Sequence, residues 1–254
     1  MFMNKIFRLL TLFTLLSFLS CNKSDDDSSN GEGNNPPKLS KIISTSASSV
    51  FTLEFNYAQN KLSEVKIPSQ GKTSKIVYEN DKAKEIQIYI DGKLEATTTL
   101  IYENDKLIKT DNGVNSNFFV QFSYNGDQLS KTEQFTILEN GELRSDFTMD
   151  YSYDLSNNVT KRTLSNATSV SEYFYTYDNK KHHYSDFSDP VRIYFFWPEG
   201  LSANNALTSA FYINQMVNSE YSYELTYNEL NFPLTSKVKN KDGETTTSIE
   251  YVYK

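Results

Sequence analysis

Apolar and polar residues alternate one by one through most of this chain from residue 39 onward. In Phe51–Tyr57, Ile86–Ile90 and Tyr221–Tyr227, for example, every second side chain is apolar. A period of two predicts a strand with one buried face and one face toward water. Antiparallel sheets permit such strands, whereas parallel sheets covered on both sides do not. The pattern therefore predicts an all-β fold with a minor helical part.

A repeated unit organises the predicted strands. Each unit is a strand that ends in Tyr, a polar turn of Asn, Asp or Gly, and a second strand. The tyrosines at the turns recur at intervals of 21 to 29 residues, with one interval of 50: Tyr57, Tyr78, Tyr102, Tyr124, Tyr153, Tyr177 and Tyr227. Asn and Gly at the turns tolerate the positive φ of tight hairpins. The repeat predicts one long, twisted antiparallel meander of hairpins that curls into a half-barrel or open sandwich, with a solenoid-like array as the alternative.

One region, between Asp178 and Glu220, breaks this rhythm. Alternating apolar residues predict a short strand over 191–197. From 203 to 216 the apolar residues fall at helical spacing instead: Ala203, Leu207, Ala210 and Phe211. A helix with one apolar stripe needs a sheet face to cover. We therefore expect one helix near 203–216, packed on the concave face of the sheet.

The N-terminus has the features of an export signal. Residues 1–20 combine Lys5 and Arg8 with an apolar run that is too short to span a bilayer, which is typical of a signal peptide. The run ends at Cys21 and resembles a bacterial lipobox, although Phe18 stands where Leu is usual. Because Cys21 is the only cysteine of the chain and follows a leader, we expect it to be lipidated.

A polar tether follows, at residues 21–37, and the remaining 38–254 form one β-rich repeat domain in this interpretation. The tether spans about 20–25 Å on average, so the domain can stand clear of the lipid surface. Lys23 and the acidic run after it are similar to the surface-export signal of Bacteroidota lipoproteins: Lys23, Asp25, Asp26 and Asp27. We expect an outer-membrane protein that faces outward, with a periplasmic orientation as the alternative.

Composition removes several classes of function. The chain of 254 residues has 25 Lys+Arg against 32 Asp+Glu, so it lacks the basic footprint of a nucleic-acid-binding protein. One Cys excludes a disulfide framework, and two His leave little for a histidine metal cage. We expect no metal and no cofactor.

Candidate catalytic groups are few. His182 and His183 are neighbours and point to opposite faces of an extended chain, so a polar loop is favoured over a metal site completed by Asp186 or Asp189. Paired carboxylates are abundant, but exposed acidic turns explain them as well as a glycosidase site does. We therefore assign no catalytic residue.

Tyrosine is the feature that suggests binding. A row of Tyr on a half-wet sheet can stack on sugar rings or on a protein partner. The possible binding face consists of Tyr151, Tyr153, Tyr173, Tyr175 and Trp197. Packing explains the same residues, because aromatic cross-strand pairs stabilise sheets that are poor in aliphatic residues.

The segments 151–159 and 175–179, which read YSYDLSNNV and YTYDN, resemble degenerate Tyr-Asp repeats of the YD/RHS type. The closing run from Leu225 to Tyr253 is similar to the C-terminus of a Bacteroidota lipoprotein family of unknown function. The resemblance implies an exported β-rich lipoprotein without known activity. The expected function is a lipid-anchored, non-catalytic surface protein that binds a glycan or protein partner. The alternatives are a carrier of an apolar ligand, with the Trp197 loop and the helix as a lid, and a hydrolase.

Overall fold

The computed structural model describes residues 37–113, 116–196 and 199–254. The predicted signal peptide, the export residues and Cys21 lie outside the described residues. The elements are β1 (Leu39–Ser46), β2 (Val50–Ala58), β3 (Lys61–Ile67), η1 (Pro68–Gln70), β4 (Lys72–Glu79), β5 (Lys82–Ile90), β6 (Lys93–Glu103), β7 (Lys106–Asp111), β8 (Phe118–Asn125), β9 (Gln128–Ile137), β10 (Leu143–Tyr153), β11 (Val159–Asn166), β12 (Val170–Tyr177), α2 (Asp189–Phe196), η2 (Glu199–Leu201), β13 (Ala206–Ile213), β14 (Met216–Tyr227), β15 (Pro233–Asn240) and β16 (Thr245–Tyr253).

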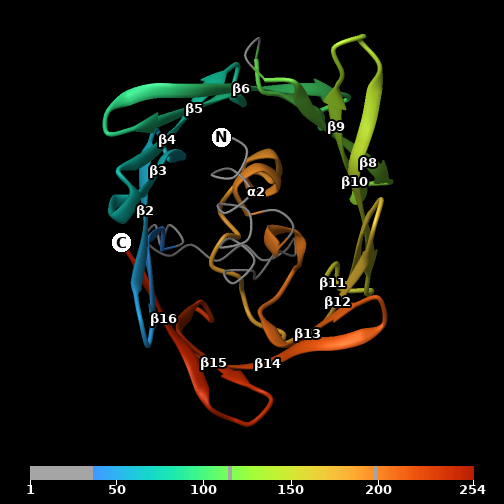
Figure 1. The fold of residues 1–254 in the computed structure, drawn as a ribbon. Helices are drawn as coiled ribbons and strands as arrows, with labels where there is room; N and C mark the ends of the chain where they lie inside the picture. The colour runs from blue at the N-terminus through green and yellow to red at the C-terminus, as the bar shows by residue number, and fades with distance from the viewer. Residues whose placement is uncertain (1–36, 114–115, 197–198) are drawn as a thin grey trace.

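The sixteen strands form one closed antiparallel barrel in which each strand pairs with its neighbours in the sequence. The first and last strands close the ring, with Ile42 opposite Tyr251, and the strands surround α2 when the barrel is viewed end-on (Figure 1). The prediction of an all-β meander is confirmed, but the half-barrel or open sandwich is wrong. The β1–β16 ladder is what closes the sheet, and it removes both unpaired edges.

Each turn-side tyrosine sits at a β-bulge. The strand register shifts next to Tyr78 and Tyr102, for example, just before the hairpin turn. The two residues of the turn after Tyr78, Asn80 and Asp81, have φ of 49° and 66°, as tight hairpins with a matching right-handed twist require. We call this end of the barrel, where Lys38 and Lys254 also pair, the tyrosine end.

The hydroxyls of these tyrosines tie neighbouring strands together. Six of them, and Tyr253 near the C-terminus, donate a hydrogen bond of 2.6–3.0 Å to a backbone carbonyl of the adjacent strand: Tyr57 to Leu39, Tyr78 to Leu62, Tyr102 to Ala83, Tyr124 to Leu107, Tyr153 to Leu129, Tyr177 to Val159 and Tyr253 to Pro233. A buried hydroxyl needs such a partner. The recurrence of Tyr therefore has a structural role in each unit, as the packing interpretation expects.

In the irregular region, the structure has a helix where a strand is predicted and a strand where a helix is predicted. Residues 189–196 form α2, and residues 206–213 form the central strand β13. The expected helix at 203–216 and strand at 191–197 are both wrong. Pro190 in the first turn of α2 favours a helix start, whereas β13 completes ladders to β12 and β14 that local spacing does not reveal. In the described part of the chain, no helix is long and apolar enough to cross a membrane.

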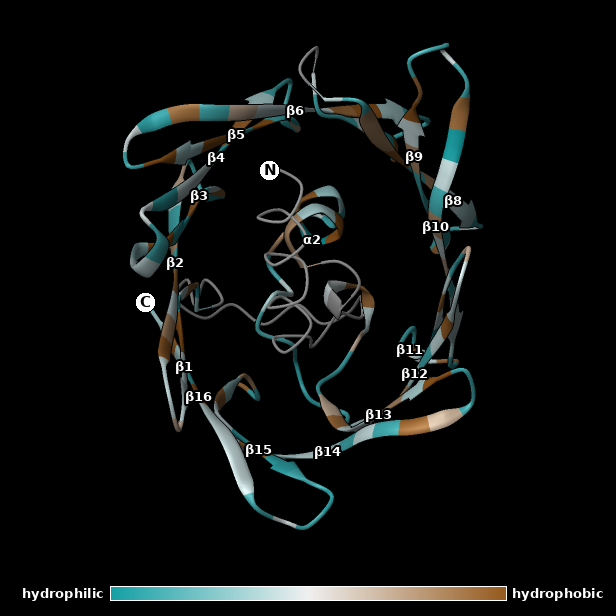
Figure 2. Cartoon of the chain, viewed as in Figure 1, coloured by the Kyte–Doolittle hydropathy of each residue, from teal (hydrophilic) through white to brown (hydrophobic). Residues whose placement is uncertain are grey.

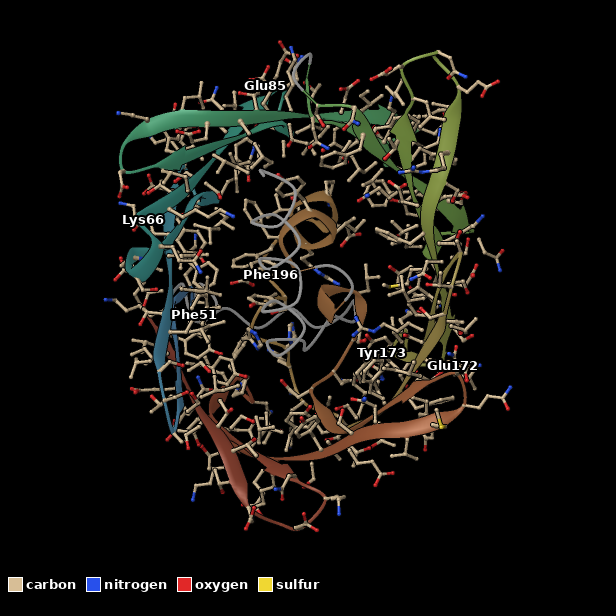
Figure 3. The ribbon with its side chains drawn as sticks, viewed as in Figure 1. Phe51, Lys66, Glu85, Glu172, Tyr173 and Phe196 are labelled. Carbon is tan, nitrogen blue, oxygen red and sulfur yellow. The ribbon has the colours of Figure 1, made fainter. Side chains whose placement is uncertain are left out.

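The two faces of the wall differ in chemistry. Phe51 and Tyr173 point into the barrel, whereas Lys66, Glu85 and Glu172 point outward (Figure 3). Apolar and polar residues alternate along the strands (Figure 2). Ion pairs link neighbouring strands on the outer face, namely Lys41–Glu54 at 2.8 Å and Lys161–Glu172 at 2.6 Å. The interior of the wall is thus mainly apolar, and the exterior carries cross-strand ion pairs beside exposed apolar residues such as Val77 and Phe174.

Candidate functional site

The chain leaves the wall after β12 and returns at β13, and the described residues between them, 178–196 and 199–205, enter the barrel from the tyrosine end. We call this segment the plug. At its neck, Asp178 N–H donates to Asn205 O (2.8 Å), and Asn205 N–H donates back to the Asp178 carboxylate (2.9 Å). The Tyr227 hydroxyl donates to the same carboxylate. Lys181 N–H donates to Asn231 O (3.1 Å). The neck is therefore closed on itself and fixed to the hairpin of β14 and β15.

The core of the plug is aromatic and packs against the inner wall. Phe55 of β2, only 1% exposed, contacts three plug rings, with centroids 6.2 Å from Tyr184, 5.6 Å from Phe187 and 6.1 Å from Phe196. Tyr184 stacks on Phe196 at 3.8 Å. Offset rings at such distances add to the stabilisation that comes from burial itself. The plug is thus part of the hydrophobic core of the barrel.

Gly200 lets the chain turn back after α2. A Cβ at this position would lie 2.9 Å from Phe196 Cβ and 3.2 Å from Arg192 O. The Arg192 Nε–H donates to Gly200 O at 2.7 Å. Only glycine fits so close an approach.

Both histidines of the chain lie inside the plug. His182 is 0% and His183 5% exposed, and their ring centroids are 4.1 Å apart. His182 Nδ1 accepts a hydrogen bond from Tyr184 N (3.0 Å), and the His183 ring packs at 4.5 Å from that of Tyr251. Burial lowers the pKa of both imidazoles well below the ordinary value. The histidines lie in a loop, as predicted, but the loop is buried rather than polar, and both imidazoles are neutral core side chains.

The carboxylates near these histidines do not complete a metal site. Asp189 is largely exposed and lies 3.5 Å from Arg192, while burial raises the pKa of the half-buried Asp186. Among residues 37–113, 116–196 and 199–254, no group of three or more His, Cys, Asp or Glu side chains could hold a metal ion.

The predicted binding face turns inward. Four of its residues line the interior of the wall, two of them buried and two partly buried: Tyr151, Tyr175, Tyr153 and Tyr173. Trp197 lies outside the described residues. Ligand binding by these tyrosines stays a prediction.

An arginine organises part of this interior surface. The Arg162 guanidinium lies 3.9 Å from the Tyr173 ring centroid and 5.5 Å from that of Tyr175. Tyr173 also stacks on Phe211 at 4.5 Å. Such cation–π contacts stabilise a buried cation. The sequence pattern around Arg162 gives no sign of this inward position, because a bulge next to Tyr153 shifts the register.

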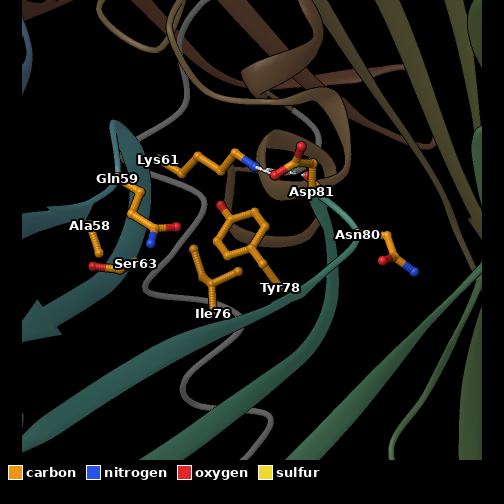
Figure 4. Close-up of a pocket in the computed structure, with 8 residues that line it drawn as sticks. All are labelled: Ala58, Gln59, Lys61, Ser63, Ile76, Tyr78, Asn80 and Asp81. Atoms are coloured by element: carbon orange, nitrogen blue, oxygen red, sulfur yellow. Dashed lines mark hydrogen bonds and ion pairs between the residues drawn. The ribbon is translucent and has the colours of Figure 1, made fainter.

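A surface cleft of about 380 Å³ opens between the first two hairpin turns of the tyrosine end. It is lined by Ala58, Gln59, Lys61, Ser63, Ile76, Tyr78, Asn80 and Asp81. The Lys61 ammonium pairs with the Asp81 carboxylate above the Tyr78 ring (Figure 4). No pattern within a single strand indicates this cleft. An alignment of the first two hairpins would have indicated it, because the small residues Ala58 and Ser63 of the first hairpin correspond to Glu79 and Lys84 in the second.

Known proteins share the architecture of this chain rather than its sequence. No protein-family model matches it, and no curated protein does. Two of the solved structures that are similar to this chain are described as porin-like proteins. One, from Bacteroides vulgatus, has a TM-score of 0.53 and 14% identity over 86% of this chain and 99% of the other. The second, from Bacteroides uniformis, has a TM-score of 0.54 and 13% identity over 86% and 98%. At these identities the likeness concerns the barrel fold alone.

Proposed function

We propose that this chain is a lipid-anchored, non-catalytic protein of the outer membrane that faces outward and binds a glycan or protein partner. In this proposal the barrel stands in water and only the lipid on Cys21 enters the membrane. The Bacteroidota lipoproteins with Tyr-Asp repeats, which the sequence resembles, are exported β-rich proteins of the same kind.

The charged outer wall is the observation that carries the proposal. A barrel that spans a membrane presents an apolar band about 25 Å tall to the lipid, and a charge at its middle costs about 2–4 kcal/mol. Here Lys41–Glu54 and Lys161–Glu172 are cross-strand ion pairs on the outer face, while aromatic side chains fill the interior. A wall of this kind favours water outside, so attachment to the membrane needs a separate anchor.

Two observations support a binding role rather than catalysis. The only two imidazoles are buried in the plug, where they cannot exchange protons with a bound substrate. Many carboxylates of the outer face are already engaged in ion pairs, such as Glu64 with Lys66 at 2.9 Å.

Protease treatment of intact cells tests the location. We expect the full chain with a C-terminal epitope tag to be found in the outer membrane and degraded at the cell surface. Cys21→Ala should lose the lipid and leave the membrane fraction. The matched variant Asp25→Ala/Asp26→Ala/Asp27→Ala should keep the lipid but become protected, because only the export signal is removed. Protection of the unmodified protein in intact cells would contradict outward exposure.

A further inference from the structure

We propose that the cleft between the first two hairpin turns of the tyrosine end binds a single neutral sugar residue. This inference rests on the proposed glycan-binding function and assigns it to a site other than the interior tyrosines. Pockets for small molecules typically measure about 300–1,000 Å³, so a cleft of about 380 Å³ suits a ligand of one ring.

The lining of the cleft has the chemistry that sugars need. The exposed part of the Tyr78 ring supplies apolar surface for the C–H face of a pyranose, and Ile76, which is 6% exposed, forms the floor beneath it. The Gln59 amide and the Ser63 hydroxyl can both donate and accept hydrogen bonds, as sugar hydroxyls do. Tyr78 is held in place, because its own hydroxyl donates to Leu62 O at 2.8 Å. A fixed ring binds at a lower entropic cost than a mobile one.

The charges at the cleft favour a neutral ligand. Lys61 and Asp81 form an ion pair across the two turns, and Lys61 also lies 5.3 Å from the Tyr78 ring centroid. One cation and one anion leave no net charge for an acidic or basic ligand. Both groups still have free hydrogen-bonding capacity, and charge-assisted hydrogen bonds to sugar hydroxyls are stronger than neutral ones.

The chain itself shows why a cleft forms here and how to close it. The first and second hairpins have the same register, with Tyr57 opposite Leu62 and Tyr78 opposite Ala83. In the second hairpin the positions equivalent to Ala58 and Ser63 hold Glu79 and Lys84, which pair at 2.7 Å. The first hairpin has only the small side chains of Ala58 and Ser63 at these two positions, and both of them line the cleft.

The test uses this difference. Amide chemical shifts of the full mature chain are followed by NMR during titration with methyl glycosides of glucose, galactose, mannose and N-acetylglucosamine. We expect at least one of them to shift amides of residues 58–63 and 76–81 with millimolar affinity. Ala58→Glu/Ser63→Lys installs the pair of the next hairpin and should weaken binding at least tenfold at an unchanged Tm. Glu79→Ala/Lys84→Ser, the matched control, should bind as the unmodified protein does.

The outcomes separate this inference from the proposed function. Shifts confined to the interior tyrosines would overturn the cleft and leave glycan binding in place. No shift with any of the four probes, or equal binding by Ala58→Glu/Ser63→Lys, would also overturn it. Surface exposure is measured independently on intact cells.

Discussion

Phe55→Ala should lower the free energy of unfolding by about 3–5 kcal/mol, as large-to-small substitutions of fully buried aromatic residues do. Phe55 is the wall residue that joins the barrel to the plug, because its ring contacts Tyr184, Phe187 and Phe196. Removal of the ring leaves a cavity between the wall and the plug. The wall cannot easily move inward to fill it, because β2 is hydrogen-bonded to β1 on one side and to β3 on the other. Urea denaturation followed by circular dichroism measures the effect.

An outward-facing phenylalanine is the matched control. Phe174 of β12 is 38% exposed and touches Tyr212 at its edge, with a ring-centroid distance of 5.5 Å. Phe174→Ala should therefore cost about 1 kcal/mol or less. Equal losses for the two variants would mean that the plug does not pack on the inner wall.

Acidification from pH 7 to pH 5 should destabilise the plug, by up to about 1.4 kcal/mol per histidine for each pH unit below about 6.5. The pKa of His182 and that of His183 are both lowered well below the ordinary value, chiefly by burial. The folded state then binds fewer protons than the unfolded state below pH 6.5. Stability is fully present above that pH and is lost as the pH falls.

The titratable groups near His182 and His183 also favour the neutral form of the two imidazoles. Arg192 of α2 and the neighbouring imidazole both lower the pKa of His182 further. Tyr251 and Tyr57, on the wall, stay protonated because burial raises their pKa values. Asp186, which follows the two histidines in the same loop, has a pKa raised by burial, so it loses its charge on acidification rather than holding a histidinium in place.

Hydrogen exchange of the plug amides at pH 7 and pH 5 measures this effect, after correction for the intrinsic exchange rate. His183→Phe should remove about half of the pH dependence, because a phenyl ring fits between Tyr184 and Tyr251 and does not titrate. Within the described residues the His183 Nδ1 has no hydrogen-bond partner, so this substitution breaks none there. A plug equally protected at both pH values would contradict the account.

The sequence was most informative where structure is local. Alternation and turn chemistry predicted the hairpins because both depend on neighbouring residues, as in the turn at Asn80 and Asp81. The closing ladder between β1 and β16 joins residues about 200 positions apart, such as Ser44 and Ile249. No local pattern records that pairing, so the closure of the barrel was not predictable.

The plug is the second part of the fold that the sequence does not predict. Its histidines and acidic residues give it the composition of a surface loop, yet the barrel buries it and supplies aromatic partners. The apolar spacing in 203–216 fits a helix, but the open edge of β12 selected a strand there, and tertiary pairing overrode the local signal. The cleft forms where Ala58 and Ser63 stand in place of an ion pair such as Glu79–Lys84. Only an alignment of the two hairpins reveals that replacement.

The central claim is that the barrel wall faces water and that its attachment to the membrane comes only from the lipid. The most direct measurement is the molar mass of the mature chain with Cys21→Ser, by light scattering in buffer without detergent. We expect a monodisperse, β-rich monomer that melts cooperatively and does not float with liposomes. Aggregation that only detergent reverses, or spontaneous insertion into liposomes, would contradict this account.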